Sequence, residues 1–167
     1  MKPTKELAFE NLYKSHKDKI FRLCLGFVKD RDLAHDLFQE ILIKLWKHLD
    51  SFRSESDIST WIYRVAYNTA ISFSAKEKRQ PMNTELPDGL DLVDPENSSH
   101  EKELQLQKLY EAINSLTETD RVIAMLLLEN TPYKTIADVT GITENYVAVK
   151  VNRIKATLTQ KLNPHGK

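Results

Sequence analysis

The sequence is poor in the residues from which phosphate loops, disulfides and metal sites are built. Its 167 residues include only four glycines, and these form neither a phosphate-binding loop nor a nucleophile turn. The single cysteine, Cys24, has no partner for an internal disulfide, and the five histidines show no metal-ligand spacing. We therefore predict a protein that is not an enzyme and that uses no metal, no cofactor and no small-molecule substrate.

Long apolar runs are also missing. The longest, Val122 to Leu128, is far shorter than the roughly 18 residues that a membrane-spanning helix needs. The charged amino terminus lacks the apolar segment of a signal peptide. Hydrophobic residues still make up 41% of the chain, which is enough for a core and excludes a wholly disordered protein. We expect a globular, cytoplasmic protein.

The net charge is zero, because 24 basic residues balance 24 acidic ones, but the charges are unevenly distributed. Residues 1–80 carry a net charge of +4, residues 81–103 carry −6, and residues 104–167 carry +2. This order suits two nucleic-acid-facing units separated by an acidic segment that limits binding to arbitrary DNA.

No proline occurs between Thr4 and Gln80, which favours helices in the first half of the chain. Apolar residues recur there at intervals of three and four, the spacing of amphipathic helices. This spacing predicts helices over residues 9–27, 33–49 and 60–77, with a polar loop over residues 51–59.

Prolines and acidic residues interrupt the periodic pattern after Gln80, which predicts a flexible linker. Apolar periodicity resumes at Leu106. The predicted fold is therefore all-α, with two small helical domains joined by a flexible acidic linker. The predicted ranges are residues 1–79 for the first domain, 80–103 for the linker and 104–167 for the second domain.

The second domain shows the pattern of a helix-turn-helix. A capping box over residues 117–120 opens one helix. Thr131 and Pro132 then predict the N-cap and first residue of a short helix. Gly141 ends that helix, and Thr143 caps the last one.

The last helix carries small residues, amides and cations opposite its buried stripe. Amides can reach base edges in the major groove, while cations meet phosphates. An ordinary helical hairpin with a solvated face is the alternative. The candidate residues are Asn145, Ala148, Val149, Lys150, Asn152, Arg153 and Lys155.

The third helix carries aromatic residues interleaved with cations on the face opposite its core stripe. Unpaired bases stack on aromatic rings while their phosphates pair with cations, so this face suits single-stranded nucleic acid. Alternatively, the aromatic residues pack on a neighbouring helix. The residues of this face are Tyr63, Arg64, Tyr67, Ile71, Ser74 and Lys78, with Trp61 at the start of the helix.

The second helix places Asp36, Gln39, Glu40 and Ile43 opposite its apolar stripe. Asp36 and Glu40 lie one turn apart, but no third ligand supports a metal site. An exposed isoleucine among charged residues instead indicates a protein interface.

Together these patterns resemble one known family, the extracytoplasmic-function (ECF) group of the bacterial sigma-70 family. Three motifs carry the resemblance in this order: DLFQEILIKLW over residues 36–46, FR at 52–53 followed by STWIYRVA over 59–66, and the helix-turn-helix of residues 136–153. The resemblance covers about residues 7–79, as region 2, and 104–162, as region 4.

The resemblance implies a dissociable subunit that binds core RNA polymerase, directs it to promoters and promotes DNA melting and transcription initiation. It places core polymerase binding at Asp36, Gln39 and Glu40, to which we add the exposed Ile43. It places binding of the minus-ten element at Phe52, Arg53, Trp61, Tyr63, Arg64, Tyr67, Asn68 and Lys78. It places binding of the minus-thirty-five element at Glu144, Asn145, Ala148, Val149, Lys150, Asn152, Arg153 and Lys155.

The implied partners are core RNA polymerase, promoter DNA and an anti-sigma factor, which in many family members is membrane-anchored. Tyr67 and Asn68 stand where the family commonly has arginine and asparagine, so the minus-ten helix is less basic than usual. One alternative is a helix-turn-helix transcriptional regulator, which would bind a symmetric duplex operator tightly by itself. A helical adaptor with merely solvated basic faces is another, and it would show little salt-dependent affinity for DNA.

Overall fold

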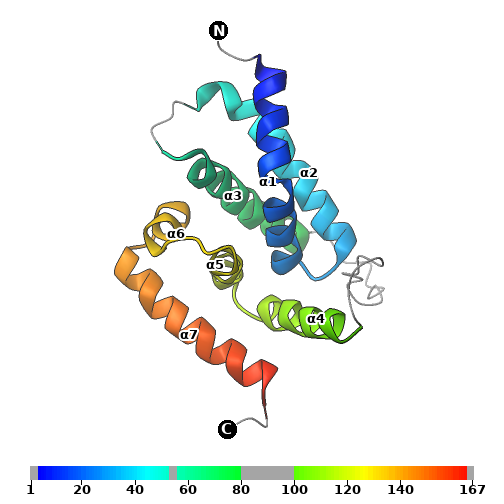
Figure 1. Ribbon diagram of the computed structural model, residues 1–167, viewed down its shortest axis with the longest axis vertical. Coiled ribbons are helices and arrows are strands. Elements are labelled where there is room, and N and C mark those ends of the chain that lie inside the picture. The colour runs from blue at the N-terminus through cyan, green and yellow to red at the C-terminus, as the bar shows by residue number, and fades with distance from the viewer. Residues whose placement is uncertain (1–3, 53–55, 80–99, 165–167) are drawn as a thin grey trace.

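The computed structural model describes residues 4–52, 56–79 and 100–164, which form seven α-helices and one short 3-10 helix without any strand (Figure 1). The first half contains α1 (Lys5–Phe27), α2 (Arg31–His48), the 3-10 helix η1 (Leu49–Ser51) and α3 (Ile58–Arg79). The second half contains α4 (His100–Asn114), α5 (Glu118–Leu128), α6 (Tyr133–Thr140) and α7 (Glu144–Leu162). The prediction of an all-α fold with two helical units is confirmed.

In the first half, α1 packs against α2 and α2 packs against α3 (Figure 1). Side-chain oxygens satisfy the free amides at the helix starts: Thr4 Oγ1 accepts from the Leu7 amide, and Asp30 Oδ1 accepts from the Leu33 amide. The apolar stripes predicted from the sequence form the core between these helices. Its fully buried members include Ile20, Leu37, Ile41, Leu45 and Ile62.

In the second half, one predicted helix start and one predicted capping bond need correction. The short helix α6 begins at Tyr133, because Pro132 keeps an extended ψ of 149° and acts as the N-cap in place of Thr131. Thr117 precedes α5 as predicted, but its hydroxyl makes no capping bond. Asp120, the other residue of the predicted capping box, pairs with Lys150 of α7.

The boundary between the two halves also differs from the prediction. Helix α4 begins at His100, so the last four residues of the predicted linker are helical. Residues 80–99, the rest of that predicted flexible acidic linker, lie outside the described part of the chain.

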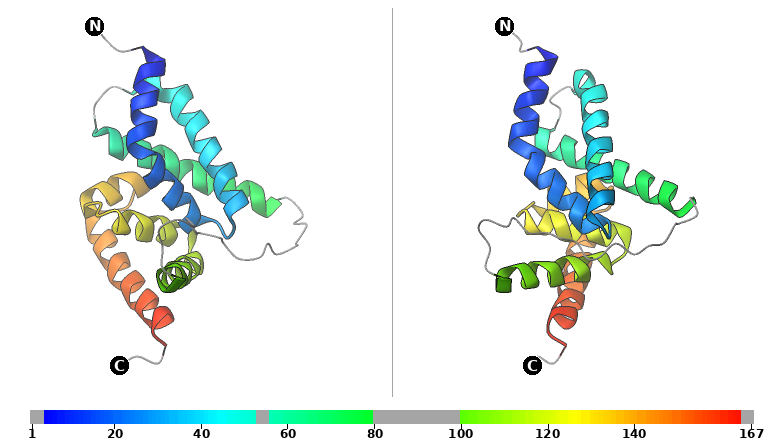
Figure 2. Two further views of the ribbon diagram at one scale, coloured as in Figure 1. Left: turned by 45° about the vertical axis from the view of Figure 1, so that its right-hand side comes forward. Right: turned by 90° about the vertical axis from the view of Figure 1, so that its right-hand side faces the viewer.

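The two halves of the molecule pack directly on each other. Helix α1 contacts α4 and α5, and α3 contacts α6 (Figure 2). Buried side chains from both halves form a single contiguous cluster. Gly26 of α1 is one point of close approach, because a β-carbon there would clash with Sδ of Met125 in α5. A glycine at this position therefore lets α1 and α5 come together.

Candidate nucleic-acid interface

The exposed face of α7 carries most of the residues predicted to read duplex DNA. Gly141, with φ of +78°, ends α6, and Thr143 Oγ1 accepts a hydrogen bond of 3.1 Å from the Tyr146 amide. These two features make the turn that sets α7 beside α6. The opposite face of α7 buries Val147, Val151 and Ile154. The predicted residues that face solvent are Glu144, Asn145, Val149, Asn152, Arg153 and Lys155.

Two predicted residues of α7 are less free. Ala148 is half-buried. Lys150 Nζ lies 2.9 Å from Asp120 Oδ1 of α5, and 5.2 Å from the centre of the Tyr146 ring. Lys150 therefore links α7 to α5 through an ion pair. Among the cations predicted to bind DNA on α7, Arg153 and Lys155 are the exposed ones.

The predicted outward orientation of Tyr63 is wrong. Its side chain is only 4% exposed and belongs to the core. Burial is the main cause of the raised pKa of its hydroxyl, and the charges of Glu129 and Arg22 also act on it. Tyr63 thus lies where α1, α3 and the end of α5 meet, a junction that the periodicity of α3 alone does not reveal.

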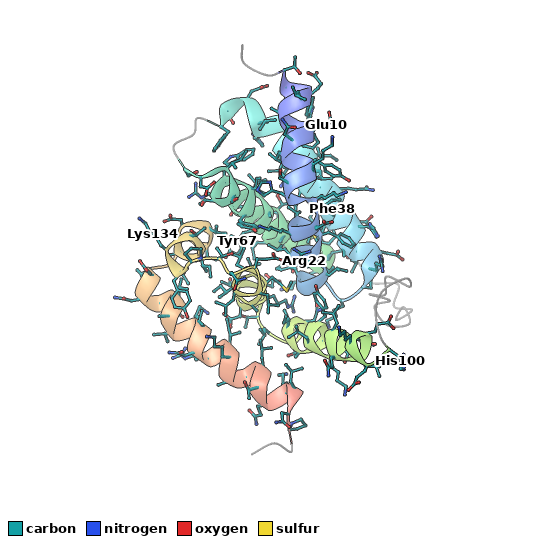
Figure 3. All side chains as sticks on the ribbon, in the orientation of Figure 1. Glu10, Arg22, Phe38, Tyr67, His100 and Lys134 are labelled. Atoms are coloured by element: carbon teal, nitrogen blue, oxygen red, sulfur yellow. The ribbon has the colours of Figure 1, made fainter. Side chains whose placement is uncertain are left out.

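Two half-buried residues of the outward face of α3 contact the second half of the chain. Tyr67, labelled in Figure 3, has its Oη 3.2 Å from Thr119 Oγ1 in α5. Arg64 Nε donates a hydrogen bond of 3.4 Å to the carbonyl oxygen of Asp138 in α6. These two candidates therefore contact other helices of the same chain.

Glu118, in the first turn of α5, binds the remaining polar groups of this face. Its Oε1 lies 2.9 Å from Lys78 Nζ and also accepts a hydrogen bond from the Ser74 hydroxyl. The hydrogen bond from Ser74, followed by that from Lys78, lowers the pKa of Glu118. The carboxylate is therefore ionised at neutral pH.

Phe52 and Trp61 form an aromatic pair beside the start of α3. Their ring centres lie 5.1 Å apart, and both side chains are half-buried. Asn68 is exposed further along α3. Arg53 lies outside the described residues. Among the predicted minus-ten residues that the structure describes, only Tyr63 is buried, while Asn68 and Lys78 are exposed and the others are half-buried.

The face of α2 predicted to bind protein is exposed. Asp36 and Gln39 face solvent, Glu40 is half-buried, and Ile43 is 52% exposed. Carboxylates and an amide surrounding an exposed aliphatic side chain form a small apolar patch with a polar rim, as at protein interfaces.

Groups that would indicate other chemistry are not found within the described ranges. No cluster of histidine, cysteine or acidic residues there could hold a metal ion, and none of the helices described is long and apolar enough to cross a membrane. Cys24 is buried in α1, and burial raises the pKa of its thiol, which disfavours a reactive thiolate.

The contacts that join the two halves were missed by the sequence analysis. Arg22 of α1 binds Glu129, just after α5, with Nε–Oε1 and Nη2–Oε2 distances of 2.6 and 3.1 Å. Arg121 Nη1 of α5 donates a hydrogen bond of 3.0 Å to the carbonyl oxygen of Phe27 at the end of α1. In the sequence, Glu129 stands directly after the longest apolar run, and this was the only sign that an acidic residue lies at the edge of the core.

Comparison with known families gives one match for each half of the chain. The family described as "Sigma-70 region 2" matches residues 12–80, and "Sigma-70, region 4" matches residues 106–158. The chain is 29% identical over 169 residues to the ECF RNA polymerase sigma-E factor of Haemophilus influenzae, covering 94% of this chain and 88% of the relative. It is 29% identical over 170 residues to the protein of the same name from Escherichia coli K12, with coverages of 94% and 87%.

Two solved structures share the fold. One is the sigma factor RpoE in complex with the anti-sigma factor NepR from Bartonella quintana, with a TM-score of 0.68, 20% identity, and coverage of 92% of this chain and 98% of that one. The other is CnrH in complex with the cytosolic domain of CnrY, with a TM-score of 0.71, 16% identity, and coverages of 96% and 91%. Taken together, the two family matches span most of the chain in the order region 2, region 4. The chain therefore belongs to the sigma-70 family, and within it to the ECF group.

Proposed function

We propose that this chain is a dissociable RNA polymerase subunit that binds core enzyme, directs it to specific promoters and promotes DNA melting and transcription initiation. The observation that carries the proposal is that regions 2 and 4 match the two halves bearing the α3 and α7 faces. The relatives named as RNA polymerase sigma factors support it. The chain itself contributes binding rather than chemistry, and it acts in the cytoplasm.

Residues 1–79 form the region that binds core polymerase and the minus-ten element. The exposed face of α2 offers Asp36, Gln39 and Glu40 as polar contacts and Ile43 as an apolar anchor. The aromatic pair of Phe52 and Trp61 offers a surface on which unpaired bases stack.

Residues 104–167 form the region that binds the minus-thirty-five element as duplex. On α7, Asn145 and Asn152 are exposed and can reach base edges, while Arg153 and Lys155 meet phosphates. Residues 80–103 connect the two binding regions.

An anti-sigma factor is the third proposed partner. The two solved structures that share this fold were determined with a bound anti-sigma factor or the cytosolic domain of a second protein. A protein of this kind would compete for surfaces that core polymerase or DNA must reach.

Transcription reconstituted from purified components tests this function. Adding the full chain to core polymerase lacking any sigma factor should start transcripts at discrete sites on DNA from the organism that encodes it. A helix-turn-helix regulator, the alternative that the comparisons do not favour, would bind duplex DNA by itself and start no transcripts. Absence of discrete initiation by an active core preparation would overturn the proposal.

A further inference from the structure

Val149 is an exposed aliphatic side chain in the middle of the α7 face that carries the predicted DNA contacts. It is 44% exposed. Helix α7 packs on α4, α5 and α6, and its opposite face buries Val147, Val151 and Ile154. Val149 therefore lies outside the core that holds α7 in place.

Two other large hydrophobic residues of α7 are exposed, but neither occupies an equivalent position. The ring of Tyr146 has Lys150 Nζ 5.2 Å from its centre. Leu162 ends the helix, and at 1.5 Å per residue it lies about 20 Å along the axis from Val149. Among the large aliphatic residues of α7, Val149 is therefore the exposed one nearest the helix start, the end that a helix-turn-helix places against base edges.

Asparagines flank Val149 on the same face of the helix. Asn145 precedes Val149 by four residues and Asn152 follows it by three, so the three side chains lie on one side of α7, and all are exposed. In the major groove an asparagine amide pairs with N6 and N7 of adenine, while thymine presents its C5 methyl group to apolar side chains. A valine between two asparagines therefore matches the groups that neighbouring A·T pairs present.

Exposed cations around this face favour DNA over a protein as its partner. Arg153 lies one turn beyond Val149, Lys155 follows shortly after, and both are exposed. Lys134 of α6, labelled in Figure 3, is exposed as well. Phosphate contacts from such cations set the orientation of the helix on the duplex without reading its sequence. The choice of base is thus left to the uncharged side chains between them.

We propose that Val149 is a specificity-determining residue for the minus-thirty-five element, and that it contacts the C5 methyl group of one thymine in the major groove. This inference rests on the proposed function and deepens it, since it names the base that α7 selects at one position. The contact removes apolar surface of both groups from water, and a base without this methyl group cannot provide it.

The test uses a promoter at which the wild-type chain and core polymerase start transcription. Each thymine of its minus-thirty-five element, on either strand, is replaced in turn by deoxyuridine, which removes the C5 methyl group and keeps every hydrogen-bonding group. Competition between the two templates for the complex of chain and core polymerase gives their relative affinities. We expect one replacement to lower the affinity of the wild type by roughly threefold to fivefold, the effect of losing one buried methyl group.

Three variants of the full chain show whether Val149 makes this contact. Val149→Ala should bind the thymine and uracil templates equally, because the methyl groups that meet the base are gone. Val149→Ile keeps the branched side chain and should discriminate as the wild type does. The matched control Leu162→Ala removes an exposed apolar side chain from the same helix and should also keep the discrimination. Circular dichroism and titration with core polymerase check the helical content and core affinity of each variant.

The inference is overturned if the minus-thirty-five element contains no thymine, or if no single replacement weakens binding by the wild type. Discrimination that survives in Val149→Ala, or that is lost in Leu162→Ala, would overturn it as well. In each of these cases discrete initiation by the wild-type chain on the unmodified promoter still supports the proposed function. A wild-type chain that starts no discrete transcripts with core polymerase would contradict the function itself.

Discussion

Tyr63 places its ring in the core where α1, α3 and the end of α5 meet, with 4% of the side chain exposed. Tyr63→Phe keeps the ring, so we expect unchanged affinity for single-stranded DNA and a free energy of unfolding within about 1 kcal/mol of wild type. Tyr63→Ala removes the ring and should lower the free energy of unfolding by about 3–5 kcal/mol. Urea unfolding followed by circular dichroism measures both. If a stable Tyr63→Phe protein lost its affinity for single-stranded DNA, Tyr63 would have to be a DNA-binding residue and our assignment to the core would be wrong.

Asp36 is the sharpest single test of the α2 surface, because it is exposed and the structure gives it no role in folding. Asp36→Arg reverses a charge at the proposed interface, so affinity for core polymerase should fall by roughly tenfold or more. Glu101→Arg, at an exposed position of α4, makes the same charge change as a control. Fluorescence anisotropy of labelled chain titrated with core polymerase gives both affinities. Equal affinities for the two variants would refute the assignment.

At the level of single residues, the exposure of a side chain was predictable where it depends only on the residue's position around its own helix. The outward positions of Asp36 and Ile43 on α2, and of Asn152 and Arg153 on α7, follow from helical periodicity, because no other helix covers those faces. The burial of Tyr63 was not predictable in this way, since it depends on helices that are far away in the sequence.

At the level of elements, the start of α7 depends on Thr143, whose hydroxyl accepts a bond from the Tyr146 amide. Thr143→Ala should lower the free energy of unfolding by about 1 kcal/mol, and Thr143→Ser should restore most of it. Thr131→Ala is the matched control, because Pro132 and not Thr131 is the N-cap of α6. Thermal unfolding of the three variants measures the difference. If Thr131→Ala lowered the free energy of unfolding more than Thr143→Ala does, the assigned starts of α6 and α7 would be wrong.

The helices were largely predictable because each has a local signal. Gly141 marks a left-handed residue and Thr143 a cap, and apolar periodicity gives the length of each helix. The capping roles predicted for the Thr117 and Thr131 side chains are not seen. A side chain near a helix start has other partners, as Asp120 does in Lys150, and sequence spacing does not show which partner it takes.

At the level of the whole molecule, two helical units were predictable but their packing was not. Arg22 and Glu129 are far apart in the sequence, and the close contact of Gly26 with Met125 also joins opposite halves. Such contacts have no periodic signature. The packing brings Glu118 of α5 against Lys78 of α3 and leaves the α2 and α7 faces exposed.

The zero net charge fits this arrangement. The basic first half is neutralised in part by acidic groups that lie elsewhere in the chain, and Glu118 is one that does so by direct contact with Lys78. Weak attraction of the free protein for arbitrary DNA is thus expected from its charge distribution.

The most direct test of the central claim maps the 5′ ends of transcripts made by core polymerase with and without the full chain. We predict starts that depend on the chain and share two upstream sequence blocks, one near the start and one about two to three helical turns further upstream. Asn152→Ala with Arg153→Ala should weaken selection of the upstream block and leave the block near the start unchanged. Starts that are the same with and without the chain, or that share no upstream sequence, would contradict the claim that this chain directs RNA polymerase to promoters.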